Sequence, residues 1–146
     1  LFRSVERLGG RIRKLDRKGL RAGLTNLRGV RIESGYFLEY LVPPKSATAL
    51  HIYFPDPWPK RKHLKNRFIN ERFPAIAQRV LQPGGIVYLR TDHGDYFEQM
   101  ESVFAQATAF RPIETPEELS SVLTDFEAEF LKQGLKTNRA AYQLKR

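Results

Sequence analysis

A short apolar run that ends at two prolines sets the tightest limit on how this chain can fold. Residues 49–54 read ALHIYF, and Pro55 and Pro57 follow almost at once. A short apolar run that contains β-branched and aromatic residues is typical of a buried strand. Proline lacks the backbone N–H that the interior of a sheet needs, so the strand must end at Phe54. The sequence therefore predicts a buried strand that places Asp56 just beyond its end.

The rest of the chain alternates between strand-like and helix-like patterns. Weak alternation predicts a strand at 26–33, and short stretches with apolar residues predict further strands at 86–91, 109–114 and 140–146. Apolar residues at helical spacing predict helices at 11–22, 66–81, 93–107 and 117–133, with a short helix or turn at 36–44. Strands that alternate with helices in this way indicate an α/β fold.

Three acidic residues, Glu33, Asp56 and Asp92, each follow an expected strand. Ligands of α/β folds bind beyond the carboxyl ends of the strands, so these acids form a candidate site. Simpler roles are open for two of them. Asp56 suits a turn in which it accepts a hydrogen bond from its own backbone, and Asp92 suits a helix N-cap. Against the simpler role of Asp56, Pro55 and Pro57 restrict the backbone on both sides, which favours a preorganised carboxylate.

A basic block follows the two prolines. It places five positive charges within eight residues, at Lys60, Arg61, Lys62, Lys65 and Arg67. Such a block is either a solvated surface or a contact for phosphates, with the nearby carboxylate free to select a base. Trp58 either packs in the core or stacks on a base. His63 either contacts phosphate or cofactor, or is an ordinary surface histidine.

A third candidate lies near the carboxyl end of the chain. The segment LTDFEAEF, residues 123–130, places Thr124 and Glu127 three positions apart on one face of the expected last helix. The simpler interpretation is a solvated helix whose Phe126 and Phe130 face the core.

Composition narrows the class of partner. The net charge of +9 and pI near 10.0 favour an anionic partner, with nucleic acid first, although a basic protein without such a partner is the alternative. The chain has no cysteine and three scattered histidines, so neither a disulfide nor a metal centre is expected. No apolar run approaches the roughly 20 residues that cross a bilayer, and no signal-peptide pattern opens the chain. We therefore expect a cytoplasmic protein without membrane contact.

The motifs and their order resemble the bacterial tRNA (guanine-N(7)-)-methyltransferase family. The segment FPDPWPKRKH, residues 54–63, resembles the signature of that family. The segments AGLTNLRGVRIE, LQPGGIVYLRTDHGDY and TDFEAEFLKQG follow the family's order at about its spacing. The likeness covers roughly residues 11–146, and FPDPW followed by lysine and histidine is a highly specific combination.

The resemblance implies a Rossmann-like methyltransferase sheet with helices on both faces, in a single domain over 1–146. It implies methyl transfer from S-adenosylmethionine to N(7) of a guanine in the tRNA variable loop, without a metal, by a monomer or homodimer. Asp56 matches the family's essential acid, close to both donor and base, and Glu33 matches a position near the donor's adenine. The residues implied to bind the tRNA substrate are Lys60, His63, Lys65, Arg67, Asp92, Thr124 and Glu127.

Two departures from the family pattern bear on function. The glycine-rich donor loop of E-x-G-x-G type is absent, and Gly9-Gly10 does not replace it, so we expect the N-terminal strand and that loop to be missing from this chain. A protein that truly lacked them would be a basic RNA-binding module or an inactive subunit. A DNA-binding regulator is disfavoured, since no helix-turn-helix or zinc pattern is present. Asn66 stands where the family often has arginine, which removes one potential phosphate or base contact.

Overall fold

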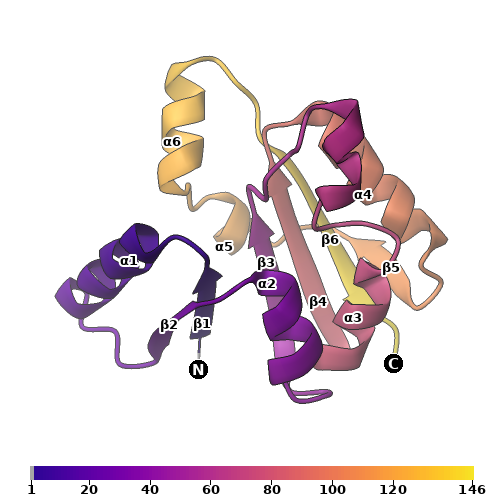
Figure 1. Ribbon diagram of the computed structural model, residues 1–146, viewed down its shortest axis with the longest axis horizontal. Coiled ribbons are helices and arrows are strands. Elements are labelled where there is room, and N and C mark those ends of the chain that lie inside the picture. The colour runs from indigo at the N-terminus through magenta and orange to yellow at the C-terminus, as the bar shows by residue number, and fades with distance from the viewer. Residues whose placement is uncertain (1) are drawn as a thin grey trace. The chain divides into compact units, whose positions relative to one another are not determined.

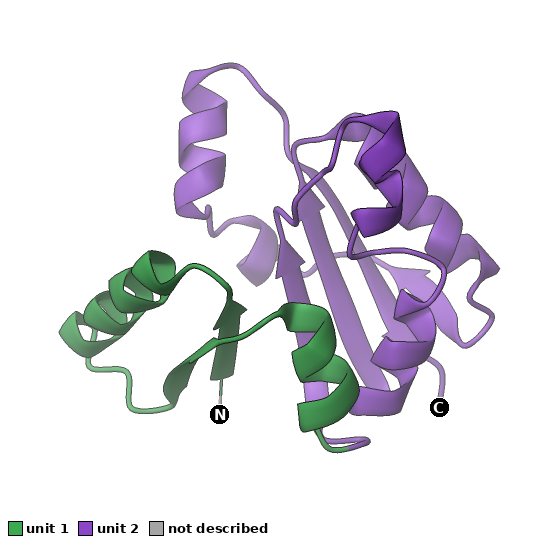
Figure 2. Cartoon of the chain, in the orientation of Figure 1, with its two compact units in different colours: residues 1–43 green, residues 44–146 purple. Residues whose placement is uncertain are grey.

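The computed structural model describes residues 2–146, and the chain divides into two compact units (Figure 2). The first unit ends at Pro43, and the second runs from Pro44 to Arg146.

The first unit is built on two parallel strands joined by a helix (Figure 1). Its elements are β1 (Phe2–Glu6), α1 (Gly9–Arg21), β2 (Leu27–Arg31), α2 (Ser34–Tyr36) and the π-helical turn η1 (Phe37–Leu41). Helix α1 lies against both strands, and a glycine makes the approach to β2 possible. A Cβ added at Gly19 would stand only 3.0 Å from the side chain of Leu27.

The second unit contains a mixed four-stranded sheet in the order β3-β4-β6-β5 (Figure 1). Its strands are β3 (Ala47–Tyr53), β4 (Leu81–Thr91), β5 (Phe110–Ile113) and β6 (Asn138–Leu144). Strand β3 runs parallel to β4, whereas β6 runs antiparallel to both of its neighbours. The carboxyl ends of β3 and β4 therefore lie at the same edge, as their pairing of Tyr53 with Arg90 requires.

The helical elements of this unit cover both faces of the sheet. They are η2 (Arg61–Asn66), α3 (Phe73–Val80), α4 (Gly94–Gln106), α5 (Glu117–Ser120) and α6 (Asp125–Lys132). On one face α3 and α4 pack over the sheet, where the ring of Phe104 stacks on Tyr142 with centroids 4.1 Å apart. On the other face α6 reaches the sheet through Glu127, which pairs with Arg90 and Arg139. The chain thus has the α/β fold that the sequence predicted.

Three elements differ from the predictions for local reasons. Strand β1 was missed because FRSVE is short and polar. The helix predicted at 66–81 is confined to α3, since Pro74 lies in its first turn, where proline is tolerated. The helix predicted at 117–133 is divided into α5 and α6, because Thr124 begins a new helix as its N-cap.

Candidate active site at the carboxyl ends of β3 and β4

A strained loop leaves the carboxyl end of β3 and carries Asp56. The two residues that flank Pro55-Asp56-Pro57 both adopt the left-handed region, with φ of 52° at Phe54 and 43° at Trp58. Such a conformation costs a non-glycine residue about 1–3 kcal/mol and persists only where surrounding contacts enforce it. Surrounding contacts therefore hold the loop in one defined backbone conformation.

Contacts on the sheet side enforce the first of these two conformations. The Phe54 N–H donates a 2.8 Å hydrogen bond to the carbonyl oxygen of Arg90, which extends the β3–β4 ladder by one residue. The Phe54 ring packs against Phe126 and Phe130 of α6, with centroids 5.7 and 5.5 Å away. These two phenylalanines were expected to face the core, but Phe126 is 46% exposed. Both contact the Phe54 ring at the start of the Asp56 loop.

The buried side chain of Arg67 holds the end of the loop that follows Asp56, at Pro57. This side chain is 2% exposed. The guanidinium donates to the Pro57 carbonyl oxygen at 2.8 Å, to Gln99 Oε1 at 2.8 Å and to Asp95 Oδ2 at 2.5 Å, and it lies over the ring of Tyr96. The hydrogen bond from Arg67 lowers the pKa of the Asp95 carboxyl. Arg67 was predicted to contact tRNA, but in the structure its donors are directed at the Asp56 loop and α4.

Asp56 and Asp92 lie at the same edge with their carboxylates exposed. They follow the paired residues Tyr53 and Arg90 by three and two positions, on neighbouring parallel strands. Neither carboxylate forms a hydrogen bond or ion pair with any residue of the described range 2–146. The N-cap role open to Asp92 belongs to His93, whose Nδ1 accepts from the Tyr96 N–H at 3.3 Å. Both acids are thus free to act on a ligand.

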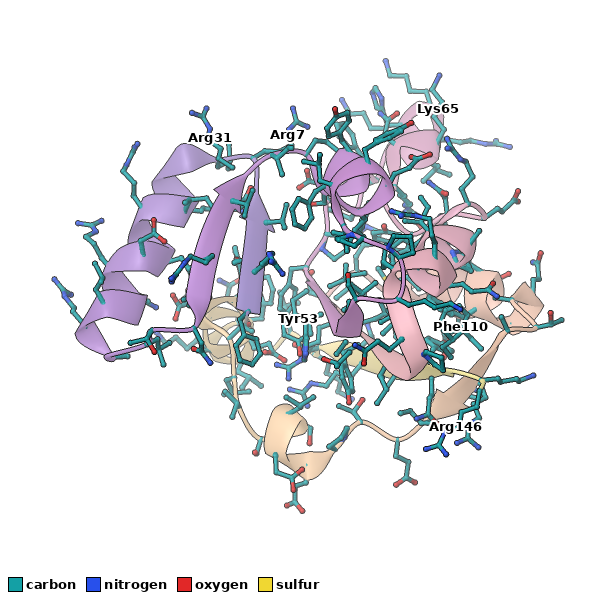
Figure 3. All side chains as sticks on the ribbon, turned by 90° about the horizontal axis from the view of Figure 1, so that it is seen from below. Arg7, Arg31, Tyr53, Lys65, Phe110 and Arg146 are labelled. Carbon is teal, nitrogen blue, oxygen red and sulfur yellow. The ribbon has the colours of Figure 1, made fainter. Side chains whose placement is uncertain are left out.

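The basic block next to Asp56 divides into an exposed part and a buried part. Four of its five charges are exposed on or just before η2, and they are Lys60, Arg61, Lys62 and Lys65. Figure 3 shows Lys65 extending away from the ribbon. His63 and Trp58 are half-buried against each other, with ring centroids 5.7 Å apart. The sequence could not separate Arg67 from the four exposed residues because all five share one charged run.

Thr124 and Glu127 form a capping box at the start of α6. The Thr124 hydroxyl accepts from the Glu127 N–H at 3.1 Å, and Glu127 Oε2 accepts from the Thr124 N–H at 2.8 Å. The Glu127 carboxylate is 1% exposed and also accepts from Arg90 at 2.7 Å and Arg139 at 2.8 Å. Burial alone would raise the pKa of Glu127, but these hydrogen bonds outweigh it and lower the pKa to about 2. Both residues were predicted to bind substrate, and in the structure both hold α6 in place.

The first unit adds two acids at the carboxyl ends of its own parallel strands. Glu33 caps α2, with its two oxygens accepting from the N–H groups of Gly35 at 2.8 Å and Tyr36 at 2.6 Å. Glu6 ends β1 and was missed by the sequence analysis, because the short polar strand that places it was not recognised. Partial burial acts to raise the pKa of Glu6, but hydrogen bonds from the Leu8 N–H and Arg11 bring it below its usual value.

Two further searches cover the described residues. Within 2–146, no group of three or more His, Cys, Asp or Glu side chains is placed to hold a metal ion. No helix in that range is both long and apolar enough to cross a membrane.

The chain matches known methyltransferases in sequence and in fold. A family model described as "Putative methyltransferase" matches residues 2–142. The chain is similar to proteins named tRNA (guanine-N(7)-)-methyltransferase. One, from Syntrophotalea carbinolica, is 37% identical over 117 residues, which are 77% of this chain and 50% of that protein. Another, from Alcanivorax borkumensis, is 40% identical over 98 residues, which are 67% of this chain and 41% of that protein.

The chain therefore spans about half the length, or less, of these two curated relatives. Among solved structures, it resembles the 16S rRNA methyltransferase KamB with a TM-score of 0.60 and 16% identity, over 100% of this chain and 77% of that one. At this identity the likeness shows a shared methyltransferase fold. The family model, the two relatives and the motifs agree, and the chain belongs to the tRNA (guanine-N(7)-)-methyltransferase family.

Proposed function

We propose that the protein containing this chain transfers a methyl group from S-adenosylmethionine to N(7) of a guanine in tRNA, within the cytoplasm. The observation that carries the proposal is Asp56, an exposed carboxylate without a protein partner, held in a strained two-proline loop beside four exposed basic residues. The family model covers both units, which supports a single methyltransferase domain.

The chemistry of the reaction suits a carboxylate that is fixed and unpaired. Guanine N(7) carries a free lone pair at neutral pH, so no base is needed to remove a proton before attack. As the new N–C bond forms, the C–S bond of the sulfonium breaks, a neutral thioether leaves and the guanine ring becomes cationic. Asp56 offsets that developing charge and accepts hydrogen bonds from the base edge. Its loop supplies the alignment that a direct displacement needs.

The residues present also fit the methyl donor. S-adenosylmethionine supplies an electrophilic methyl group on a positively charged sulfur, together with ribose hydroxyls and an amino group that donate hydrogen bonds. Asp56 and Asp92 offer exposed carboxylates at the strand ends, where α/β folds bind their ligands. Within the first unit, Glu6 ends β1 and Glu33 follows the carboxyl end of β2. From the family resemblance we assign Glu33 to the adenosine part of the donor. No residue in these roles requires a metal.

The exposed basic residues near Asp56 supply contacts for the tRNA backbone. Lys60, Lys62 and Lys65 present flexible point charges that bind phosphates without reading sequence. Trp58 stands between Asp56 and these charges along the chain, and His63 lies within the basic block. The two rings contact each other at a tilt of 44°, and each offers an aromatic face on which a base can stack.

The test uses the full-length protein with unmodified tRNA and donor labelled in its methyl group. Reduction with borohydride followed by aniline cleaves RNA at N(7)-methylguanosine, so the modified position can be mapped directly. We expect label in tRNA and cleavage at one guanine of the variable loop. Label on another atom or another position would overturn the assignment. Binding of tRNA without any methyl transfer would indicate an RNA-binding module.

A further inference from the structure

Positive charge is concentrated in the first unit. Residues 1–43 contain ten basic and four acidic residues, a net charge of +6 out of the chain's +9. Helix α1 contributes six of the ten, namely Arg11, Arg13, Lys14, Arg17, Lys18 and Arg21, and its one acidic residue is Asp16. Most of the charge that sets this protein apart as basic therefore lies outside the block next to Asp56.

The helix turns all six basic residues to one side. At about 100° per residue, Arg11, Arg13, Lys14, Arg17, Lys18 and Arg21 fall within an arc of roughly 160°. The opposite side carries Ile12, Leu15 and Gly19, and it is this side that meets the strands, as the approach of Gly19 to Leu27 shows. Figure 3 shows nitrogen-tipped side chains along the outer side of α1.

This arrangement lowers the stability of the helix. Arg13–Arg17, Arg17–Arg21 and Lys14–Lys18 are like-charge pairs at i,i+4, each of which destabilises a helix by about 0.2–0.5 kcal/mol. The first turn contains no acidic residue, so nothing there complements the helix dipole. Arg13, Arg17 and Arg21 are exposed and make no ion pair or hydrogen bond with residues 2–146 through their side chains. The position of Arg21 in the last turn, where a cation complements the helix dipole, offsets part of this repulsion, but no ion pair of these three arginines within 2–146 does.

We propose that the outer face of α1, defined by Arg13, Arg17 and Arg21 with their basic neighbours, binds the phosphate backbone of the tRNA. The proposal rests on the proposed function, since it adds a second RNA-contacting surface to the basic block. The three arginines form a row about 12 Å long, at 1.5 Å of rise per residue. A polyanion placed along this row removes the like-charge repulsion and releases its own counterions.

An anionic membrane surface is the competing partner for a basic helix, and the apolar side of α1 argues against it. Helices that bind membranes turn an apolar face into the lipid. In α1 that face is turned toward β1 and β2, and its outer face carries a single large exposed apolar residue, Leu20. The geometry therefore favours binding to a polyanion through charge alone.

The test compares two double charge reversals in the full-length protein. One variant is Arg17→Glu with Arg21→Glu on α1, and the matched control is Lys145→Glu with Arg146→Glu. The control residues are exposed and lie past the end of β6, which is antiparallel to β4, so they stand at the amino end of β4, away from Asp92. Both variants change the net charge by the same amount, so any effect of overall charge is common to them.

The measurement is the tRNA dissociation constant as a function of salt, without methyl donor. We expect the α1 variant to bind on the order of tenfold more weakly, with the slope of log K against log salt reduced by about 1.5 to 2, and the control to change little. The thermal stability of the α1 variant should change little, because the reversal makes the pair of positions 13 and 17 attractive while the pair of positions 17 and 21 stays like-charged. Equal weakening in both variants, or none in either, would overturn the proposal. If the α1 variant lost binding to anionic phosphatidylglycerol vesicles but kept its affinity for tRNA, the proposal would be overturned and a membrane surface would be the partner of α1.

The donor-free assay separates this proposal from the proposed function. A protein that binds tRNA through α1 yet transfers no methyl group would leave the α1 surface supported and the enzymatic assignment contradicted. Methyl transfer at the expected guanine, together with tRNA binding that does not change in the α1 variant, would support the enzymatic assignment and contradict the role of the α1 surface.

Discussion

The Nε of Arg67 donates a 2.8 Å hydrogen bond to the carbonyl oxygen of Pro57, the residue next to Asp56. The same guanidinium reaches Gln99 and Asp95 on α4, so one buried side chain ties the Asp56 loop to a helix of the core. Only the planar fork of arginine donates in these directions at once, and lysine cannot reproduce it. Arg67 is thus a positioning residue for Asp56 in the proposed reaction.

Replacing Arg67 should slow methyl transfer without changing how tRNA binding depends on salt. In Arg67→Gln we expect kcat to fall on the order of 10- to 100-fold, because a small misplacement of a reacting group has effects of this size. The salt slope of tRNA binding should stay unchanged, and Arg67→Lys should restore little of kcat. Steady-state kinetics and binding titrations together give both quantities. If the salt slope of tRNA binding fell by about one in Arg67→Gln and kept its wild-type value in Arg67→Lys, Arg67 would instead be a phosphate contact.

Arg67 also shows where prediction from sequence reaches its limit. A run of five charges within eight residues carries no periodicity that separates a buried member from an exposed one. The partners of Arg67 are Pro57, ten residues earlier, and Gln99 and Asp95, about thirty residues later. The pairing depends on the packing of α4 near η2 and the loop, which the local pattern of the chain does not contain.

The exposed lysines next to Asp56 should behave in the opposite way to Arg67. Substituting Lys62 or Lys65 by Ala should weaken tRNA binding and reduce its salt slope by about one for each residue, because each removes one phosphate contact. Lys132→Ala is a matched control, since Lys132 is also exposed but pairs with Glu129 on α6. A salt slope that stays the same in both lysine variants would show that the block is a solvated surface.

Acid should weaken the contact that holds α6 to the sheet. The pKa of Glu127 is about 2 in the folded protein against an ordinary value of 4.5. The unfolded chain therefore takes up this proton first as the pH falls. The contribution of Glu127 to the unfolding free energy, on the order of 3 kcal/mol, is complete above about pH 4.5 and is lost toward pH 2.

Urea unfolding of the wild type and Glu127→Gln between pH 6 and pH 3 measures this effect. The variant should be about 3 kcal/mol less stable at pH 6, because Arg90 loses a buried partner, and its stability should fall less steeply with acid. Glu129→Gln on the same helix is the control, and it should change stability by less than about 1 kcal/mol, since its pair with Lys132 is exposed. Equal acid slopes in the wild type and Glu127→Gln would contradict the role assigned to Glu127.

The strands were the most predictable part of the fold. The strands predicted at 26–33, 49–54, 86–91, 109–114 and 140–146 are confirmed as β2 to β6. The burial predicted for 49–54 was wrong, because β3 stands at the edge of the four-stranded sheet and has no buried residue. Helix ends were harder to predict. The sequence TDFE was interpreted as the interior of a helix, although it fits the capping-box pattern that begins one, and Pro74 marked the true start of α3.

The sequence predicted where the candidate site lies, at the carboxyl ends of β3 and β4, but it did not predict the backbone conformation of the loop that carries Asp56. Strand ends alone placed Asp56 and Asp92 at one edge, and the pairing of β3 with β4 confirms that placement. Nothing in the sequence indicated that Phe54 and Trp58 would adopt left-handed conformations. The conformation of Phe54 follows from contacts with Arg90 and α6, which form only when distant segments pack together.

The most direct test of the central claim is methyl transfer by Asp56→Asn in the full-length protein. The variant keeps the shape of the side chain and removes its charge, so it isolates the electrostatic role of the carboxylate. Glu98→Gln, at an exposed position on α4, serves as the control for loss of one negative charge. We predict that the rate of transfer to tRNA falls at least about 100-fold in Asp56→Asn, with tRNA affinity within about twofold of the wild type and Glu98→Gln fully active. Full activity in Asp56→Asn would contradict the account.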